Sequence, residues 1–526
     1  MFDPYAQPGV SALMQAWMEE LHGDDWTLDP ALYGYKTDWR PSDYVVGWVA
    51  KSWEFADPST YVVHLRQGIS WQNIYPANGR EFTADDVVYH YNRNFGLGSG
   101  MTPSTYNMSS AMYQNMTSVT ATDKYTVVFK WKISNPELIV ENMQALGGAG
   151  NLENSDAVKI WGDLNDWHHA IGTGPFILQD FVSSSSATLI KNPNYWGHDE
   201  RYPQNQLPYL DGIKILIIPN DATALAALRT GKIDVIAPTS FANAQLMQKT
   251  NPEILQLTVP ATNTITIDPR NDVAPFKDIR VRQAMQEAID LPTIASSVYG
   301  GNAPPHPSAL TGEALKGYGW PYDQWPQDLK DQYAYNPTAA KKLLADAGYP
   351  TGFKTDIVVD NSGDMDVIQV VKSYFAQVGI DMEIRPMDPV SWVAFVRTTK
   401  KYDQLANQAT NGNLGLIYEP SRQLQRLTLG YATNWLMVND SVMNADFAKY
   451  VAATSIDDVK QALQDANKRA AQQFFSISLL APNNYYLYQP WLKGYNGQSQ
   501  SLQGTNFPLL IGFYGARFWI DQKIKK

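Results

Sequence analysis

The order helix, glycine, strand recurs along the chain and restricts it to folds in which helices pack on a mixed β-sheet. ATALAALRTGKIDVI is typical of a helix that ends at Gly231 and is followed by a short strand. Further on, DIRVRQAMQEAID, PTAAKKLLADAGY and DVIQVVKSYFAQVGIDMEIRPM repeat this order. Such segments build α/β folds, because each helix buries its apolar stripe against the sheet. We therefore predict an α/β protein whose second half forms a separate α/β lobe.

The length of the chain requires more than one hydrophobic core. A chain of 526 residues is too long for one compact core, and roughly one unit per ~150 residues suggests about three structural units. Its 44% hydrophobic and 18% charged residues are ordinary for a globular protein and unlike a disordered chain. We expect a multi-lobed protein with a large buried core.

Charge and cysteine content exclude several classes of function. The formal net charge is -11, and no run of lysine and arginine is long enough to follow a phosphate backbone. We therefore expect no nucleic-acid partner. Cysteine is absent, which removes disulfides, thiolate nucleophiles and cysteine-based metal sites. No stretch approaches the ~20 consecutive apolar residues that a membrane helix needs.

The first residues bear on where the protein works. MFDPYAQPG has neither the basic region nor the apolar region of a signal peptide. Because the sequence opens directly on an Asp-Pro loop pattern, we expect a leader and a first strand to precede it. A lipid-modified cysteine that anchors the protein would lie in that leader.

Several segments predict local structure. VVGWVAKSWEFADPSTYVVHLRQGISW holds two alternating runs that are separated by a turn at Asp57, which is typical of a hairpin. In EFTADDVVYHYNRNF, Thr83 can act as an N-cap with Asp86 three residues on, followed by an apolar stripe at helical spacing. This predicts a helix that begins near Ala84. SALMQAWMEELHG is also typical of a helix, and DVKQALQDANKRAAQQFFSISLL of a long helix that changes to an apolar strand.

The sequence lacks the motifs of common catalytic and cofactor sites. It has no GxxxxGK[ST] phosphate loop, HExxH zinc helix, GxSxG nucleophile elbow or EF-hand spacing. GLGSG at 96–100 lacks a following helix signature, and His168 and His169 have no third ligand at metal spacing. The pair Asp85-Asp86 is explained by charge complementarity at a helix N-terminus. We expect no catalytic residue, metal or cofactor, and a protein that is not an enzyme.

Several ordered blocks across nearly the whole chain resemble the class C (family 5) solute-binding proteins of ABC importers, which bind peptides, nickel complexes or oligosaccharides. The blocks are VAKSWEFADPSTYVVHLRQGISWQN with EFTADDVVYHYNR, IGTGPFILQDF, NPNYWG with LDGIKILIIPNDATALAALRTGKIDVI, FKDIRVRQAMQEAID, and YNPTAAKKLLADAGYP with VGIDMEIRPMD. Each block alone is weak evidence, but their common order is hard to obtain by chance.

The resemblance implies an α/β fold of two lobes, with an extra subdomain in the first lobe and a hinge between the lobes, where the solute is enclosed. We assign lobe I to 1–45, 165–265 and 485–526, the extra subdomain to 46–164, and lobe II to 266–484. It further implies a monomer, periplasmic or on the cell surface, that passes its solute to the ABC permease. No catalytic group is needed, because closure around the solute creates the shape that the permease recognises.

The resemblance also implies where the solute is bound. The contacts lie in the loop 3–9, around Tyr106, near the hinge, and in the loop 408–413. The predicted ligand-binding residues are Tyr5, Gln7, Tyr106, Asn263, Gln408, Asn411, Asn413 and Glu419.

The blocks themselves are interpreted as structural. Gly172, Gly174 and Pro175 shape a backbone crossing, and Arg280 and Arg282 anchor a helix start by ion pairs.

The loop 408–413 departs from the family pattern. Peptide binders of this kind usually place a tryptophan and an aspartate there, and the aspartate pairs with the α-ammonium of the ligand. Here Gln408, Asn411 and Asn413 are neutral amides, and only Glu419 could substitute, although it aligns better with a downstream position. A buried ammonium without a counter-charge is unfavourable, whereas amides suit hydroxyl-rich ligands, and this favours an oligosaccharide. The 16 tryptophans and 30 tyrosines agree, and peptide and oligosaccharide both stay open.

Two other functions also stay open. An acidic, aromatic-rich secreted protein of this size could be a glycoside hydrolase, although no sequence pair is marked as the two carboxyl groups ~5 to 10 Å apart that hydrolysis needs. A sensor subunit, which passes its closed form to a signalling receptor, would share the sequence features of a transport protein.

Overall fold

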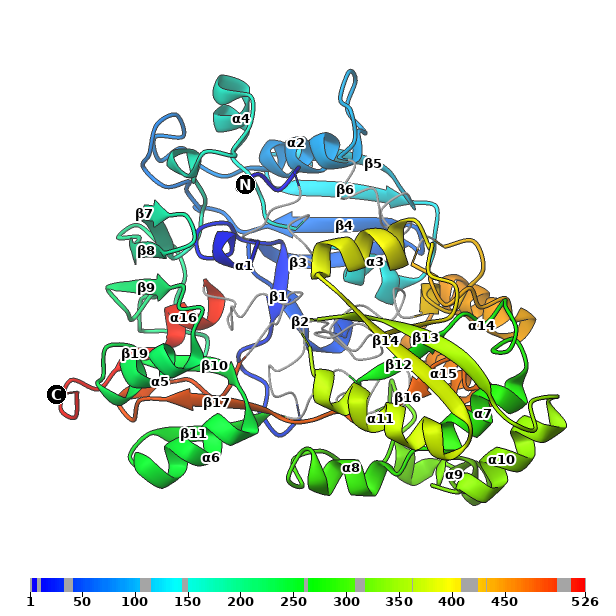
Figure 1. The fold of residues 1–526 in the computed structure, drawn as a ribbon. Helices are drawn as coiled ribbons and strands as arrows, with labels where there is room; N and C mark the ends of the chain where they lie inside the picture. Colours follow the sequence, from blue (N-terminus) through cyan, green and yellow to red (C-terminus); the bar gives the residue numbers. More distant parts are fainter. Residues whose placement is uncertain are drawn as a thin grey trace. The chain divides into compact units, whose positions relative to one another are not determined.

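The computed structural model describes residues 2–6, 11–32, 41–104, 115–143, 150–259, 264–307, 317–361, 363–407, 424–431, 433–498 and 512–525 (Figure 1). The chain divides into two compact units, which are described separately. Unit 1 comprises Met1–Val259 and Tyr485–Lys526, and unit 2 comprises Pro260–Asn484. Within the described ranges, no helix is both long enough and apolar enough to cross a membrane.

A four-stranded antiparallel sheet in unit 1 has the order β3-β4-β6-β5. Its strands are β3 (Ala50–Asp57), β4 (Thr60–Leu65), β5 (Met116–Asp123) and β6 (Thr126–Trp131). β3 and β4 form the hairpin that was predicted around Asp57, and every second residue of β4 is buried. Helix α2 (Ala84–Phe95) lies along β5 and β6 (Figure 1).

Helix α2 begins where the sequence predicts. Thr83 is the N-cap of a capping box, in which the Asp86 carboxylate accepts a hydrogen bond from the Thr83 main-chain N at 3.1 Å. The same carboxylate forms an ion pair of 2.6 Å with Arg80. Gly96 ends the helix with a φ of 64°, in the left-handed region that favours glycine.

The other sheets of unit 1 are smaller. One is antiparallel, with the order β7 (Phe176–Val182), β8 (Ser186–Lys191), β9 (Gly212–Leu216). Another joins β10 (Val235–Thr239) and β11 (Leu255–Val259) through β17 (Asn484–Tyr488), which comes after unit 2 in the sequence. Two-stranded pairings join β1 (His22–Asp24) to β2 (Val45–Gly47) and β18 (Leu492–Lys493) to β19 (Trp519–Ile520).

The helix expected over SALMQAWMEELHG is a single turn, α1 (Ser11–Met14), so that prediction is wrong beyond Met14. The chain after α1 crosses the backbone at Gly172 and Gly174. A Cβ atom on Gly172 would lie 1.6 Å from the Trp17 carbonyl oxygen, and Gly174 N donates to the same oxygen at 2.9 Å. This crossing, at the glycines where it was predicted, uses a carbonyl that a longer helix would need.

Further helices of unit 1 are short. They are α3 (Pro136–Asn142), α4 (Ser155–Trp161), α5 (Asp221–Arg229), α6 (Phe241–Thr250) and α16 (Phe513–Arg517), with the 3-10 turns η1 (Ser42–Tyr44) and η4 (Trp167–His169).

Unit 2 contains the mixed sheet predicted from the helix, glycine, strand order. Its strand order is β14-β13-β15-β12-β16, with β13 parallel to β14 and β15, and β12 antiparallel to β15 and β16. The strands are β12 (Thr266–Pro269), β13 (Phe353–Asp360), β14 (Ile380–Met387), β15 (Leu405–Asn407) and β16 (Ile477–Ser478). Gly379, between helix α11 (Met365–Gln377) and β14, has a φ of 90°.

Helices cover this sheet and close one hydrophobic core, in which Val281, Ile357 and Val371 are fully buried. The helices of unit 2 are α7 (Ile279–Glu287), α8 (Leu291–Ser297), α9 (Gln327–Tyr333), α10 (Pro337–Asp346), α11 (Met365–Gln377), α12 (Pro389–Trp392), α14 (Ser441–Ala452) and α15 (Ile456–Gln473), with the 3-10 turn η5 (Tyr322–Gln324) and the π-helix η6 (Val393–Thr398).

The two arginines predicted to anchor a helix start behave differently. Arg280 forms an ion pair of 2.6 Å with Asp278, the N-cap of α7, as predicted. For Arg282 the prediction is wrong, because its buried guanidinium donates to main-chain carbonyls, including Phe276 O at 2.6 Å and Gln473 O at 2.8 Å. Burial lowers the pKa of Arg282 to about 10. Arg282 therefore holds the end of α15 through uncharged acceptors.

Candidate functional site

Among the predicted solute contacts, the described residues include only Tyr5. Its hydroxyl donates to Thr102 O at 3.1 Å, and its ring lies 4.7 Å from the guanidinium carbon of Arg93. The other predicted contacts lie outside the described residues: Gln7, Tyr106, Asn263, Gln408, Asn411, Asn413 and Glu419. The solute-contact assignment therefore stays a prediction.

A buried ionic network holds Tyr5 in place. Arg93 on α2 donates to both carboxylate oxygens of Asp3, at 2.8 and 2.6 Å, and to Glu153 at 2.5 Å. The side chains of Asp3 and Glu153 are 2% and 0% exposed. Burial acts to raise the pKa of Asp3, but the hydrogen bonds and charge of Arg93, with main-chain donors from Tyr5 and Leu164, outweigh it and lower the pKa. The early loop is thereby fixed to α2.

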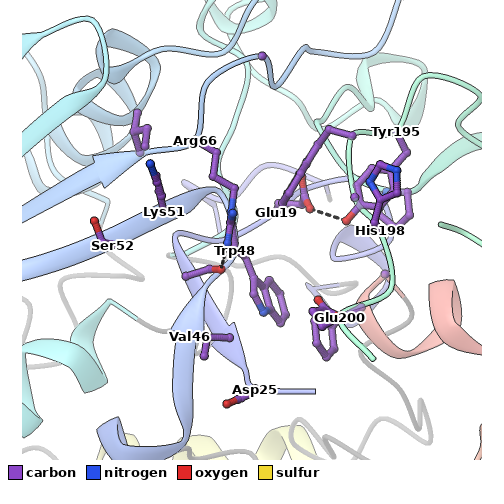
Figure 2. A pocket seen from close by; sticks show the side chains of 18 of the residues that line it. Glu19, Asp25, Val46, Trp48, Lys51, Ser52, Arg66, Tyr195, His198 and Glu200 are labelled. Carbon is purple, nitrogen blue, oxygen red and sulfur yellow. Dashed lines mark hydrogen bonds between the residues drawn. The ribbon is translucent and has the colours of Figure 1, made fainter. Parts of the chain in front are cut away.

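A cavity of about 1330 Å³ is lined by residues of unit 1 (Figure 2). Its walls come from the turn after α1, from β2 and the start of β3, from the end of β4, from the NPNYWG loop and from α16. Of the predicted structural residues, Pro175 lines it as well. Segments far apart in the sequence thus form one site.

Aromatic side chains form part of the cavity wall. Trp48 stacks on Phe513 of α16 with ring centroids 4.4 Å apart and an interplanar angle of 10°. Trp53, Tyr195 and Trp196 also line the cavity. Rings of this size offer flat apolar surface to a bound molecule.

Glu19 is the most perturbed acid of the cavity. Its carboxylate accepts a hydrogen bond from the Tyr195 hydroxyl at 2.9 Å (Figure 2). It accepts another from Trp196 Nε1 at 2.8 Å. The residue is 5% exposed, and burial raises its pKa from 4.5 to about 7, against the opposing effect of these donors and of Thr173. Glu19 therefore takes up or releases a proton near neutral pH.

The remaining charged groups divide into paired and unpaired side chains. Arg517 forms a two-pronged ion pair with Glu200, in which Nε donates at 2.9 Å. Arg66 donates from Nε to Trp48 O at 2.7 Å and from Nη2 to Gly47 O at 3.1 Å. Lys51 lines the cavity as well and is exposed.

His168 and His169, which are adjacent in the sequence, each contact a different neighbouring side chain. His168 Nδ1 is 2.7 Å from Asp166, and His169 stacks on Trp161 at 4.0 Å. In the part of the chain that the structure describes, no three histidine, aspartate or glutamate side chains gather as metal ligands do.

Sequence reasoning did not find the cavity. Several of its residues lie in the blocks that carry the family resemblance, among them Trp53, Arg66 and Trp196. These blocks were interpreted as structural, because no single block shows that they meet in space. A usable signal was the tryptophan that two of these blocks contain, Trp53 and Trp196.

Solved structures of two-lobed periplasmic binding proteins share the α/β fold of this chain. HbpA2 from Haemophilus parasuis matches with a TM-score of 0.76 and 20% identity, covering 99% of this chain and 97% of the other. The periplasmic binding protein DppA from Helicobacter pylori, solved with the peptide STSA, matches with a TM-score of 0.73 and 20% identity, covering 99% and 95%. The sequence profile of the bacterial extracellular solute-binding proteins, family 5, matches residues 44–421. The chain belongs to this family, and the predicted fold class is confirmed.

Sequence relatives support the same assignment. Heme-binding protein A of Haemophilus influenzae is 28% identical over 346 residues, which is 63% of this chain and 60% of that protein. The glutathione-binding protein GsiB of Shigella flexneri is 27% identical over 343 residues, 65% of this chain and 61% of that protein. The chain thus spans about three fifths of the length of these relatives.

Proposed function

We propose that this chain is the solute-capturing component of an ABC importer, which encloses a peptide or an oligosaccharide between two lobes and delivers it to the permease. The observation that carries this proposal is the match of the family 5 solute-binding profile over residues 44–421. Such a protein needs contacts that favour the closed, solute-bound form, and no reacting group. We therefore propose that it is not an enzyme.

Two observations point to different solutes. The relatives include a glutathione-binding protein and a structure with the peptide STSA bound, and glutathione is itself a small peptide. This supports a peptide. The neutral amides Gln408, Asn411 and Asn413, in the loop where peptide binders carry an aspartate, support an oligosaccharide.

The remaining features of the proposal follow from the family. Members are extracellular solute-binding proteins, so we propose a periplasmic or cell-surface location. Anchoring by a lipid in a leader, action as a monomer and partnership with permease subunits belong to the same proposal.

A thermal-shift screen of the purified chain against peptide and oligosaccharide libraries tests the proposal, because a ligand that binds only the folded state raises the melting temperature. We expect stabilisation by one of the two libraries. Oligosaccharides alone would support the role of the neutral amides, whereas free-amine peptides would direct attention to Glu419 as the partner of the ammonium. Chemical turnover of an oligosaccharide would contradict the proposal and favour a glycoside hydrolase.

A further inference from the structure

The charged side chains that line the cavity of unit 1 differ in whether they already have partners. Glu200 is paired with Arg517, and the Glu19 oxygens accept hydrogen bonds from aromatic side chains. Asp25 accepts a hydrogen bond of 2.8 Å from a main-chain N of the following turn. His198 also lines the cavity. The carboxyl groups of the cavity are thus engaged within the protein.

The cations Lys51 and Arg66 lack carboxylate partners, since neither forms an ion pair within the described ranges. Lys51 follows Ala50 in β3, and Arg66 follows Leu65, the last residue of β4; Ala50 and Leu65 are paired and both are buried. Lys51 and Arg66 both line the cavity, and Figure 2 shows them on the same side of it.

Arg66 is held in place for an external partner. Its Nε and Nη2 atoms donate to the carbonyls of Trp48 and Gly47, which fixes the plane of the guanidinium. These acceptors are uncharged, and Nη1 has no acceptor among the described residues. A fixed guanidinium with donors remaining forms strong, charge-assisted hydrogen bonds to a carboxylate.

Flat apolar surface borders these cations. The Arg66 guanidinium carbon lies 5.7 Å from the ring centroid of Trp196, and Trp48 and Trp53 line the same cavity. The volume of about 1330 Å³ exceeds the ~300 to 1,000 Å³ of common small-molecule sites, so a ring system fits beside the charged group.

We propose that this cavity is a binding site for an organic carboxylate with a planar apolar body. Arg66 binds the carboxylate, Lys51 adds a second positive charge, and the partly exposed Trp53 and Trp196 pack on the ring. The site shares no described residue with the predicted solute contacts, so it goes beyond the proposed transport function and is tested independently of it.

Isothermal titration of the full chain with matched acid and amide probes tests the site. The probes are indole-3-acetate and phenylacetate, each compared with its neutral amide. We expect both acids to bind, the larger ring more tightly, and each amide to bind at least tenfold more weakly. Rising salt concentration weakens acid binding, because the contacts are between charges.

Variants assign the binding to the two cations. We expect Arg66→Gln to weaken indole-3-acetate at least tenfold and Lys51→Gln about threefold. Arg229→Gln and Lys232→Gln remove the same charges from exposed positions of unit 1 outside the cavity, and binding by these controls stays unchanged. If Arg66→Gln fails to fold, Lys51→Gln and the salt dependence decide, because Lys51 is exposed and makes no ion pair in the described ranges.

Three outcomes would overturn the site: no binding of either acid at millimolar concentration, equal binding of acid and amide, or unchanged binding by both cavity variants. A library solute that stabilises the chain while the acids do not bind would leave the transport proposal standing and remove this inference.

Discussion

Burial determines the chemistry of Glu19. Removing its carboxylate from water disfavours the charged form, and this raises the pKa of Glu19 to about 7. The donors Trp196, Thr173 and Tyr195 favour the charged form but offset only part of the effect. Glu19 belongs to the chain after α1, and its carboxylate accepts hydrogen bonds from Tyr195 and Trp196 of the NPNYWG loop. The protonation of Glu19 is therefore linked to the contact between these two segments.

We expect Glu19→Gln to change the pH dependence of stability. The folded state binds this proton more tightly than the unfolded state, so the contribution of Glu19 to wild-type stability is greatest below pH 4.5 and is lost as the pH rises through about 7. The glutamine of the variant has no group that titrates, so the free energy of unfolding of the variant relative to wild type should rise by about 3 kcal/mol as the pH increases through this range. Urea denaturation at pH 5, 6, 7 and 8 measures it. Parallel profiles for the two proteins would contradict the raised pKa.

Arg93 is the cation on which two buried carboxylates depend. Arg93→Met leaves Asp3 and Glu153 buried without their counter-charge, and loss of one partner of a buried pair destabilises by about 3–5 kcal/mol. Urea denaturation at pH 7 measures this loss. Arg229→Met, at an exposed position of unit 1, is the control and should stay within about 0.5 kcal/mol of wild type. Adding Asp3→Asn to Arg93→Met should recover part of the loss, and a double variant weaker than the single one would argue against the charge explanation.

Single residues, in the candidate site and elsewhere, were difficult to predict from the sequence where their roles depend on distant partners. Arg280 could be predicted, since its partner Asp278 is two positions away. Arg282 could not, because its acceptors include carbonyls at the end of α15. Whether Arg66 has a carboxylate partner also depends on which acidic side chains lie close to it in the fold, and no local sequence pattern indicates that.

The backbone crossing of Gly172 over Trp17 connects two elements that sequence analysis treated separately. A Cβ at Gly172 would lie 1.6 Å from a main-chain oxygen, which no side-chain rotation relieves. We expect Gly172→Ala to reduce the free energy of unfolding by about 3 kcal/mol or more, the range of severe packing clashes. Gly162→Ala is the control: its φ is 84° with no atom within 4 Å, so it should lose only about 1–2 kcal/mol from backbone strain. Equal losses, measured by urea denaturation, would show that the crossing relaxes easily.

Elements were predictable where their determinants are local. The hairpin of β3 and β4 follows from alternation and a turn at Asp57, and α2 follows from the capping box at Thr83. The sheet β10-β17-β11 could not be predicted, because its central strand pairs with segments from before unit 2. The helix over SALMQAWMEELHG was predicted too long, because the competing contact with Gly172 and Gly174 is not local.

At the scale of the whole molecule, the two units differ in how the chain builds them. Unit 2 is one continuous segment with its own sheet and core. Unit 1 consists of two segments, and the second supplies β17, the central strand of the sheet β10-β17-β11. Tyr485 and Leu487 of that strand are buried in the small core between α5 and α6. The units should therefore respond differently when the chain is cut at their boundaries.

We expect residues 260–484 expressed alone to unfold cooperatively in urea, because every strand of their sheet is present. When residues 1–259 are expressed alone, the region of α5 and α6 should not unfold cooperatively, because β10 and β11 lose the strand β17 that lies between them. Hydrogen exchange of β10 measures this, and joining 485–526 to residue 259 through a flexible linker is the matched control that should restore its protection. If β10 is protected from hydrogen exchange in the fragment 1–259 without the linked segment, β17 is not needed to hold β10 in the sheet. The division of the chain into units would then be less strict than the sheet order implies.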